Sequence, residues 1–332
     1  MTTKIILGTA LACVGTLSVA SVAGIAYFYR RTMIRQNAKM ERTIKMAGTD
    51  WSQYKDMLAR RKQFMMEQKR EDVYVQSFDD LKLHGVYFPA IQNNSDDNII
   101  SNSKSDKNRV VICMHGYTSR SMQDFTGLTD YYFKHGFAML QTDARAHGES
   151  EGKYIGFGCL DRKDLLKWID WVIDHCGADT EIYLHGISMG ASTALMASGL
   201  DLPSQVKGIV SDCAFTSPKE VFTHVLNTMY HLPAFPFIQG ADVVNKVLAG
   251  YGTDECNAKR EVSKAKVPIL FIHGGKDTFV PVKMCNELYQ CCESPKKQLI
   301  VEEAAHGESY YKDTAAYEAA LDDFFENRDS WR

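Results

Sequence analysis

The hydrophobic and polar positions along this chain divide it into three stretches. Residues 5–29 contain no charged residue, residues 30–70 are rich in charge, and from residue 71 short apolar runs alternate with amphipathic ones. A helix rises about 1.5 Å per residue, so the 25 residues of the first stretch reach across a hydrocarbon core of about 30 Å. The pattern therefore predicts one transmembrane helix over residues 5–29, within an N-terminal anchor of residues 1–31.

Residues 32–70 form the predicted linker between this anchor and the rest of the chain. They contain few helix-breaking residues, which favours a helix, with a break near Gly48 where Thr49 or Asp50 can cap a second helix. The pattern fits both a solvated spacer and an amphipathic helix lying on a lipid surface. The two interpretations stay open.

From residue 71 onward the pattern is that of short strands separated by helices. Two alternating segments around Asp79 and Asp80 predict a β-hairpin, and the polar stretch 91–108 predicts a surface loop. Six almost continuously apolar strands are predicted at Val110–Met114, Ala138–Gln141, Ile182–Leu184, Ile209–Val210, Ile269–Ile272 and Leu299–Val301. Helices are predicted at Gln123–Lys134, Cys159–Cys176, Gly190–Leu200, Lys283–Gln290 and Ala315–Glu326.

Buried strands that alternate with helices indicate a mostly parallel, doubly wound α/β sheet with helices on both faces. We predict one such domain over residues 71–332. Ligand sites in these sheets lie at the carboxyl ends of the strands. Residues 214–262 interrupt the alternation, because they are far longer than a helical connection requires and are rich in aromatic and aliphatic residues.

Composition and charge narrow the function classes. A hydrophobic fraction of 45% and a charged fraction of 24% are typical of a folded globular chain. Residues 30–70 hold 12 Lys/Arg against 4 Asp/Glu, whereas residues 71–332 hold 25 against 37, so a basic segment precedes an acidic domain. The acidic domain argues against nucleic-acid binding, and the basic segment suits anionic lipid headgroups. We therefore expect membrane lipid to be a partner of residues 5–29 and of the linker.

The charges that flank the apolar segment predict its orientation. Only Lys4 precedes it, while Arg30 and Arg31 begin a series of basic residues that follows it. The positive-inside rule then places the acidic domain on the cytoplasmic side of a cell membrane, in a single-pass protein. A signal peptide cleaved near Ala23, which would leave the domain extracytoplasmic or secreted, is the alternative.

Two further features bear on the compartment and on assembly. The nine cysteines contain no Cys-x-x-Cys pair and several lie in apolar runs, which is typical of small buried side chains in a reducing compartment. Small residues recur every four positions from Gly8 to Gly24, and such a stripe lets two membrane helices approach closely. Weak self-association through the transmembrane helix is therefore a further expectation.

The segment Gly186-Ile187-Ser188-Met189-Gly190 carries the first sign of chemistry. It follows a predicted strand and opens a helix of small residues. Gly-x-Ser-x-Gly on a strand–turn–helix is a nucleophile elbow, in which the glycines let strand and helix meet at a sharp turn. The helix N-terminus favours the negative charge that develops there. We predict Ser188 as a catalytic nucleophile.

A serine nucleophile needs a base and an acid that orients the base. His306 lies just beyond the last predicted strand, on a short loop from which a histidine can reach the sheet edge. Asp277 follows the strand before it and falls between Ser188 and His306 in chain order, as the elbow enzymes require. Asp212, also at a strand end, is the competing acid. The predicted triad is Ser188, His306 and Asp277.

The oxyanion of such a reaction needs two hydrogen-bond donors. One is the backbone amide of Met189, directly after the nucleophile, and the other is assigned to the amide of Tyr117 in the first strand–helix loop. The Tyr117 phenol either lines the acyl pocket or simply packs. The chain has no metal-binding His/Cys motif, phosphate-binding loop or dinucleotide fingerprint, so no cofactor is predicted.

With these residues in place, the chain resembles the α/β-hydrolase superfamily over about residues 72–328. More narrowly it resembles the bacterial serine aminopeptidase-like and cinnamoyl-esterase-like hydrolases, through Asp143–Gly152, the elbow and the Asp277 loop with Val280-Pro281. The family usually has glycine where Ala146 stands. The resemblance implies an α/β-hydrolase fold in which residues 214–262 form a helical cap that sets substrate size. It also implies that His147 fixes a loop beside the site and is not the base.

Three functions remain open at this point. The first is a membrane-anchored serine hydrolase that cleaves a small carboxylic ester with an apolar acyl or aryl group through an acyl-enzyme, because the cap segment is aromatic and aliphatic. The second is a serine peptidase or amidase of the aminopeptidase-like type, since the same triad cleaves amides. The third is a non-catalytic binding protein on a hydrolase fold. A complete triad favours the first two.

Overall fold

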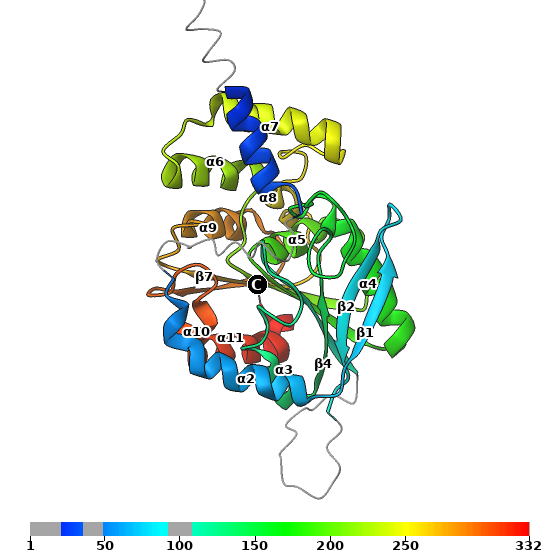
Figure 1. The fold of residues 1–332 in the computed structure, drawn as a ribbon. Coiled ribbons are helices and arrows are strands. Elements are labelled where there is room, and N and C mark those ends of the chain that lie inside the picture. The colour runs from blue at the N-terminus through cyan, green and yellow to red at the C-terminus, as the bar shows by residue number, and fades with distance from the viewer. Residues whose placement is uncertain (1–20, 36–48, 92–107, 332) are drawn as a thin grey trace, which may run out of the picture.

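The computed structural model describes residues 21–35, 49–91 and 108–331, so the predicted loop 91–108 and most of the predicted span 5–29 lie outside the described residues. Its centre is an eight-stranded sheet in the order β1-β2-β4-β3-β5-β6-β7-β8 (Figure 1). β1 (Glu71–Gln76) and β2 (Lys82–Phe88) form the predicted hairpin, and β2 pairs antiparallel with β4 (Phe137–Thr142). The remaining pairs are parallel, among β4, β3 (Arg109–Met114), β5 (Glu181–Ile187), β6 (Val206–Asp212), β7 (Ile269–Gly274) and β8 (Lys296–Val301).

Helices cover both faces of this sheet. Each face has its own apolar core, and the central strands contribute alternate side chains to the two cores, which is why their sequences are almost continuously apolar. One core includes residues of α4 (Asp161–Cys176), α5 (Met189–Ala197), α8 (Ala258–Val262) and α9 (Val282–Cys291). The other includes residues of α2 (Lys55–Glu67), α3 (Thr129–Lys134), α10 (Ser309–Lys312) and α11 (Thr314–Asn327). The predicted doubly wound α/β sheet is confirmed.

The insertion between β6 and β7 folds into helices above the carboxyl ends of the strands (Figure 1). α6 (Pro218–Met229) begins at Ser217, whose side chain accepts a hydrogen bond from the amide of Glu220, with proline in the first turn. α7 (Ala234–Ala249) ends at Gly250 in the left-handed conformation. These helices correspond to the cap that the resemblance implies for residues 214–262.

One predicted helix is much shorter in the structure. The pattern predicts helix over Gln123–Lys134, but only α3, Thr129–Lys134, is helical. The preceding residues form turns, because Met122 has a φ of +61° and its amide donates to the side chain of Gln141 at 2.9 Å. The neighbouring amide of Ser121 donates to Asp143 at 2.6 Å. The residues that follow form turns, in which the amides of Thr126 and Leu128 donate to carbonyls three residues earlier at 3.3 and 3.0 Å.

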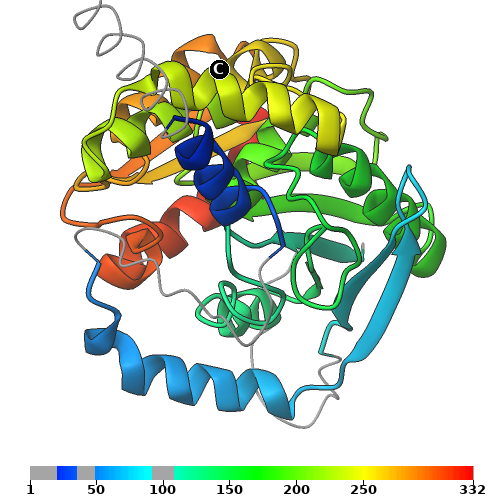
Figure 2. The ribbon, with the colours of Figure 1, turned by 45° about the horizontal axis from the view of Figure 1, so that its top comes forward.

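Residues 21–32 form a helix that packs on the cap, seen as the dark blue helix beside α7 in Figures 1 and 2. The two helices approach closely at glycines: a Cβ on Gly24 would meet Phe237 at 2.6 Å, and one on Gly240 would meet Ile25 at 2.3 Å. Tyr29 is 3% exposed and donates its hydroxyl to Asn245 at 3.3 Å. This part of the predicted anchor therefore contacts the catalytic domain directly.

The chain after this helix is also attached to the domain. Ile34 forms an antiparallel bridge with Tyr154, and the amide of Arg35 donates to the carbonyl of Lys153 at 2.8 Å. The Arg35 guanidinium donates to the carbonyl of Gly148 at 2.6 Å. The predicted boundary between an anchor ending at residue 31 and a separate linker therefore does not coincide with a break in packing.

Within the described residues, none of the helices combines the length and the apolar character that crossing a bilayer requires. Residues 5–20 of the predicted span, with most of its small-residue stripe, are outside that part of the chain. The transmembrane prediction therefore stays a prediction.

The second half of the predicted linker is a helix, as expected, and it begins where the sequence indicates. Asp50 caps the short helix η1 (Trp51–Tyr54) by accepting from the amide of Ser52 at 3.0 Å, and α2 follows. Met65 of α2 is fully buried, and the ring of Phe64 lies 6.2 Å from that of Phe133 on α3. Neither open interpretation of the linker anticipated this, because α2 packs on the sheet layer through its few apolar residues.

Candidate active site

The nucleophile elbow lies between β5 and α5. Ser188 has φ +55° and ψ −111°, a strained conformation that is held by its amide donating to the carbonyl of Asp212 at 2.8 Å. The two flanking glycines are required by contact distances: a Cβ on Gly186 would meet the Gly190 carbonyl at 2.3 Å, and one on Gly190 would meet the Met114 carbonyl at 2.0 Å. The strand and helix can therefore meet only without side chains at these positions, as the motif predicts.

The structure brings Ser188, His306 and Asp277 together. The hydroxyl of Ser188 donates to Nε2 of His306 at 2.9 Å, and Nδ1 of His306 donates to Oδ2 of Asp277 at 2.7 Å. All three residues are at least 93% buried, with exposed fractions of 7%, 2% and 5%. This is the geometry of a serine nucleophile, a base and an orienting acid.

The Asp277 carboxylate is held in its ionised form. Its other oxygen, Oδ1, accepts from the amides of Phe279 and Val280 at 2.9 and 2.8 Å. Burial by itself raises the pKa of this carboxyl, but the electrostatic interaction with His306 and hydrogen bonds from His273 and His306 outweigh burial and place the pKa well below its usual value. An acid that stays ionised can stabilise the imidazolium that forms on His306.

His273 is a second buried histidine beside this acid, and the sequence analysis did not identify it. Its Nε2 donates to the carbonyl of Val280 at 2.8 Å and lies 3.3 Å from Oδ2 of Asp277. Burial lowers the pKa of His273, but the hydrogen bond to Asp277 and the interaction with Cys285 raise it to about 10. His273, at the end of β7, therefore joins the Asp277 carboxylate to the backbone of the loop that carries it.

Asp212, the competing acid, is hydrogen-bonded through its carboxylate to hydroxyl groups and not to the base. Its carboxylate accepts from the hydroxyls of Tyr317 at 3.1 Å and Ser309 at 3.4 Å. Burial raises the pKa of Asp212 to about 6, although the charge of His273 and the Tyr317 hydrogen bond oppose the shift. The choice of Asp277 over Asp212 thus agrees with the hydrogen bonds of His306.

The two predicted oxyanion donors lie on either side of Ser188. Met189 is the first residue of α5, and Tyr117 follows Gly116, at which a Cβ would lie 3.4 Å from that of Ser188. The assignment of their amides stays a prediction. The Tyr117 phenol does line the pocket, and it donates to the carbonyl of Arg31 at 3.2 Å.

His147 fixes the neighbouring loop, as the resemblance implies. Its Nδ1 donates to the carbonyl of Arg145 at 3.0 Å, and its Nε2 accepts from the amide of Thr118 at 3.4 Å. Burial, assisted by the charge of His115, lowers the pKa of His147 to about 3, so it stays neutral. Ala146 has a φ of +59°, a left-handed conformation that explains why relatives usually carry glycine there.

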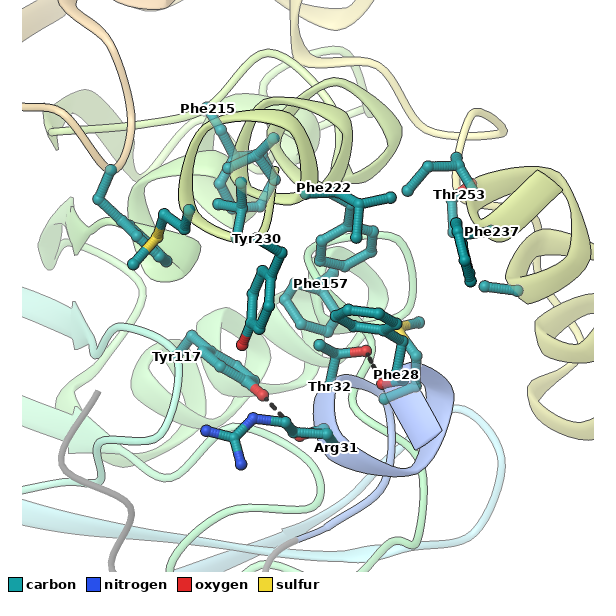
Figure 3. Close-up of a pocket in the computed structure, with 18 of the residues that line it drawn as sticks. Phe28, Arg31, Thr32, Tyr117, Phe157, Phe215, Phe222, Tyr230, Phe237 and Thr253 are labelled. Carbon is teal, nitrogen blue, oxygen red and sulfur yellow. Dashed lines mark hydrogen bonds between the residues drawn. The ribbon is translucent and has the colours of Figure 1, made fainter. Parts of the chain in front are cut away.

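An apolar pocket of about 140 Å³ opens beside Ser188 (Figure 3). Cavities of about 150 Å³ hold a benzene-sized group. Cap residues such as Phe222 and Tyr230 form one side, and Phe157 lies beneath Phe222 with ring centroids 4.7 Å apart. Phe235 of the same segment is 72% exposed and does not line the pocket. The aromatic and aliphatic character of residues 214–262 is therefore used in part for the pocket wall.

The helical segment 21–32 and Met33 supply another wall of this pocket, which the sequence analysis missed. Phe28, Arg31, Thr32 and Met33 all line it, and the Phe28 ring packs against Tyr230 and Phe237 at 5.0 and 6.0 Å (Figure 3). Arg31 is the one charged residue among the described residues that line the pocket. The sequence did not indicate that this segment lines a pocket, because its apolar pattern also predicts a membrane span.

Residues outside the predicted triad also hold the His306 loop. Glu308 is 2% exposed and accepts from the amide of Ala305 at 2.9 Å. Tyr54 and Gln53 of η1 donate to its other oxygen at 2.7 and 3.1 Å. The linker thus supports the loop that carries the base.

The potential metal ligands in the described part of the chain coincide with the triad. Donor atoms of Cys213, Asp277 and His306 lie within 4.8 Å of one another. Asp277 is hydrogen-bonded to His306, and His306 is hydrogen-bonded to Ser188. The acid–base arrangement therefore accounts for the positions of Asp277 and His306.

Comparison with known proteins places this geometry in context. Residues 105–249 match the family model described as "Serine aminopeptidase, S33". The chain is 30% identical over 220 residues to the uncharacterized protein YqkD of Bacillus subtilis, which covers 66% of this chain and 72% of that protein.

Two solved structures have a similar fold. The Pyrococcus furiosus esterase Pf2001 superposes with a TM-score of 0.62 at 22% identity, covering 81% of this chain and 93% of the esterase. The Pyrococcus horikoshii acylaminoacyl peptidase gives a TM-score of 0.54 at 15% identity, covering 79% of this chain and 43% of the peptidase. With the fold, the elbow, the family match over residues 105–249 and the B. subtilis relative in agreement, this chain belongs to the α/β-hydrolase superfamily.

Proposed function

We propose that this serine hydrolase cleaves a carboxylic ester with an apolar acyl or aryl group. The observation that carries the proposal is the hydrogen-bonded Ser188–His306–Asp277 series at the base of an apolar pocket. Ser188 attacks the ester carbonyl while His306 accepts its proton, and the same proton goes to the leaving alkoxide. Water then attacks the acyl-enzyme with His306 again as base, which releases the acid and restores the serine.

The pocket chemistry supports an ester over the N-terminal residue of a peptide. An aminopeptidase must bind a positively charged α-amino group, and a carboxylate is the usual partner for such a cation. The described residues that line the pocket include no aspartate or glutamate, and their one charged member is the cation Arg31. The family description and the peptidase of similar fold keep peptide or amide hydrolysis as the second candidate.

The proposal includes the membrane. Residues 5–29 would anchor the enzyme by one span, with the catalytic domain on the cytoplasmic side, because basic residues follow the apolar segment.

A fluorophosphonate probe and a substrate panel test the chemistry. The full chain should be labelled at Ser188, and Ser188→Ala should lose the label and about a millionfold in kcat. p-Nitrophenyl acyl esters should be cleaved and aminoacyl p-nitroanilides should not. If only the anilides were cleaved, peptide or amide hydrolysis would replace ester hydrolysis as the proposed function. If the protein were neither labelled nor active on either substrate class, the catalytic proposal would be ruled out.

A further inference from the structure

One end of the molecule exposes an unusual amount of apolar surface. Twelve large hydrophobic side chains are exposed among the described residues, and seven of them lie between residues 22 and 27 or between residues 230 and 248. On α7, Val243 and Val247 are 61% and 78% exposed and lie four residues apart, so they share the outer face of the helix. Phe235 and Leu248, at 72% and 49%, extend this surface.

The helical segment 21–32 continues the same surface. Val22 and Tyr27 are 66% and 57% exposed, and Ala23 and Ala26 are exposed beside them. Its opposite side, with Gly24, packs on α7. We define the cap face as the exposed residues Val22, Ala23, Ala26, Tyr27, Phe235, Val243, Val247 and Leu248. Exposed apolar residues gathered on two adjacent helices mark a contact with a partner or a membrane.

The cap face lies directly over the substrate pocket. Phe28 and Phe237 line the pocket from the inner sides of the two helices whose outer sides form the cap face. Figures 1 and 2 both show these helices side by side, at the end of the molecule opposite α2 and α3. Two helices thus separate the pocket from the exposed apolar surface.

The sequence that leads into the cap face indicates what covers it. The described chain starts at residue 21 at this end of the molecule, and residues 5–20 before it contain no charge. Arg30 and Arg31 follow the apolar stretch in the sequence, as basic residues commonly follow a membrane span. Charge on α7 itself contributes little, because Lys246 pairs with Asp242 at 2.8 Å. Apolar contact is therefore the main interaction that this face offers.

We propose that the cap face docks onto a lipid bilayer, with the outer sides of α7 and of the helical segment 21–32 in its interfacial layer. The enzyme then has a second contact with the membrane besides the predicted span, and the pocket lies directly below the lipid surface. The substrate is accordingly an ester that resides in the bilayer. This last part rests on the proposed esterase function, whereas docking of the cap face does not.

Site-specific fluorescence in the full chain tests docking without depending on activity. An environment-sensitive fluorescent amino acid replaces Val247 on α7 or, as the matched control, Met66 on α2, which is 44% exposed at the opposite end. The protein is reconstituted into phosphatidylcholine vesicles with and without brominated acyl chains. We expect a blue-shifted emission at position 247 that brominated lipid quenches, and a water-like, unquenched emission at position 66.

Two results would overturn the proposal. Water-like emission at both positions would show that α7 does not touch lipid. A blue shift at position 247 that rises with protein concentration and is not quenched by brominated lipid would show that a second copy of the chain covers the face.

A double variant tests the consequence for the substrate. Val243→Glu with Val247→Glu should lower hydrolysis of an acyl ester embedded in phosphatidylcholine vesicles by about tenfold, because it places charge in the interfacial layer. Hydrolysis of a soluble p-nitrophenyl ester should be unchanged, as should both activities of the control Met66→Glu. Equal rates of the double variant and the wild type on the embedded ester would contradict the bilayer substrate. If the wild type did not hydrolyse the soluble ester at all, the result would instead contradict the esterase function.

Discussion

Two buried aspartates near His306 show how local partners assign different roles to the same residue type. The Asp277 carboxylate accepts hydrogen bonds from two backbone amides and from His306, and its pKa lies below the usual value. Asp212 accepts two hydroxyls in a more apolar setting, and burial raises its pKa to about 6. The first is therefore suited to stabilise an imidazolium, and the second to hold the frame around the elbow.

Amide substitutions should separate these roles. Asp277→Asn should lower kcat by about 10⁴-fold, because the amide cannot hold His306 in the required tautomer or offset its charge. The matched change Asp212→Asn should lower kcat by less than about tenfold, since an amide resembles the partly protonated acid and Asp212 does not bond to the base. Steady-state kinetics on a soluble ester measures both. Equal losses would show that Asp212 shares the role of the orienting acid.

Protonation of His273 should make the free energy of unfolding depend on pH, and the direction of this dependence follows from the pKa shift. Its folded pKa of about 10 is above the ordinary value of 6.5, through the Asp277 carboxylate despite burial, with Cys285 and Asp212 also nearby. A group whose pKa is higher in the folded than in the unfolded protein stabilises the folded protein fully at pH values below its unfolded pKa. This contribution is lost as the pH rises to the folded pKa. The window is therefore pH 6.5 to about 10.

We expect the free energy of unfolding of the wild type to fall across that window, and that of His273→Gln to fall less steeply. Urea titrations at several pH values measure both curves, and their difference removes the contribution of other groups. Parallel curves would show that His273 is not charged in the folded protein.

At the scale of elements, the contact between the helical segment 21–32 and α7 decides the shape of the pocket. Glycines at the crossing make room for side chains of the other helix, with Gly24 against Phe237 and Gly240 against Ile25. Phe28 lines the pocket from the same segment as Gly24. α2 has the corresponding role on the other side of the sheet, where Met65 is buried. Both elements come from the part of the chain that precedes the predicted domain.

Adding a side chain at this crossing should alter substrate binding. Gly24→Val would place its Cβ 2.6 Å from the Phe237 ring, so either this ring or the helix that carries Phe28 must shift, and both line the pocket. We expect KM for an apolar soluble ester to rise about tenfold, equivalent to about 1.4 kcal/mol of lost apolar contact, with kcat little changed. Ala23→Val, on the exposed side of the same helix, is the control. Identical KM values for both variants and the wild type would mean that substrate does not use this wall.

At the scale of the whole molecule, the described basic residues near the N-terminus lie at two different ends of the domain. Arg30 and Arg31 lie at the cap end, whereas the basic residues of α2 lie at the opposite end (Figure 1). A single membrane plane cannot contact both ends of a folded domain. The cap end is the one that also carries the exposed apolar residues, so it is the end that we assign to the membrane.

The orientation across the membrane can be tested on the full chain. With a tag after Arg332, protease added to right-side-out vesicles should leave the tag intact, because the basic flank retains the domain on the cytoplasmic side. Detergent should then make the tag digestible, which shows that the protease is active. Digestion before detergent would place the domain outside the cell membrane.

The chemistry and the sheet could be predicted from sequence because their signals are local. The elbow needs Gly186, Ser188 and Gly190 within five residues, and His306 and Asp277 each lie directly beyond a strand. Parallel strands align their carboxyl ends, so residues that follow them must meet. The contacts of His273 and Glu308 could not be predicted, since each depends on a loop conformation and not on a spacing.

The sequence alone determined the fold class, the hairpin, the elbow and which residues follow the strand ends, because period and turn chemistry act over a few residues. Only the tertiary structure decided that residues 28–33 form a wall of the pocket and that α2 belongs to the sheet layer. An apolar residue gains similar free energy from lipid or from a protein partner, so the pattern of residues 21–32 could not distinguish them. The contacts of Gly24 with Phe237 and of Gly240 with Ile25, between segments more than 200 positions apart, show that the inner face of that helix packs against protein.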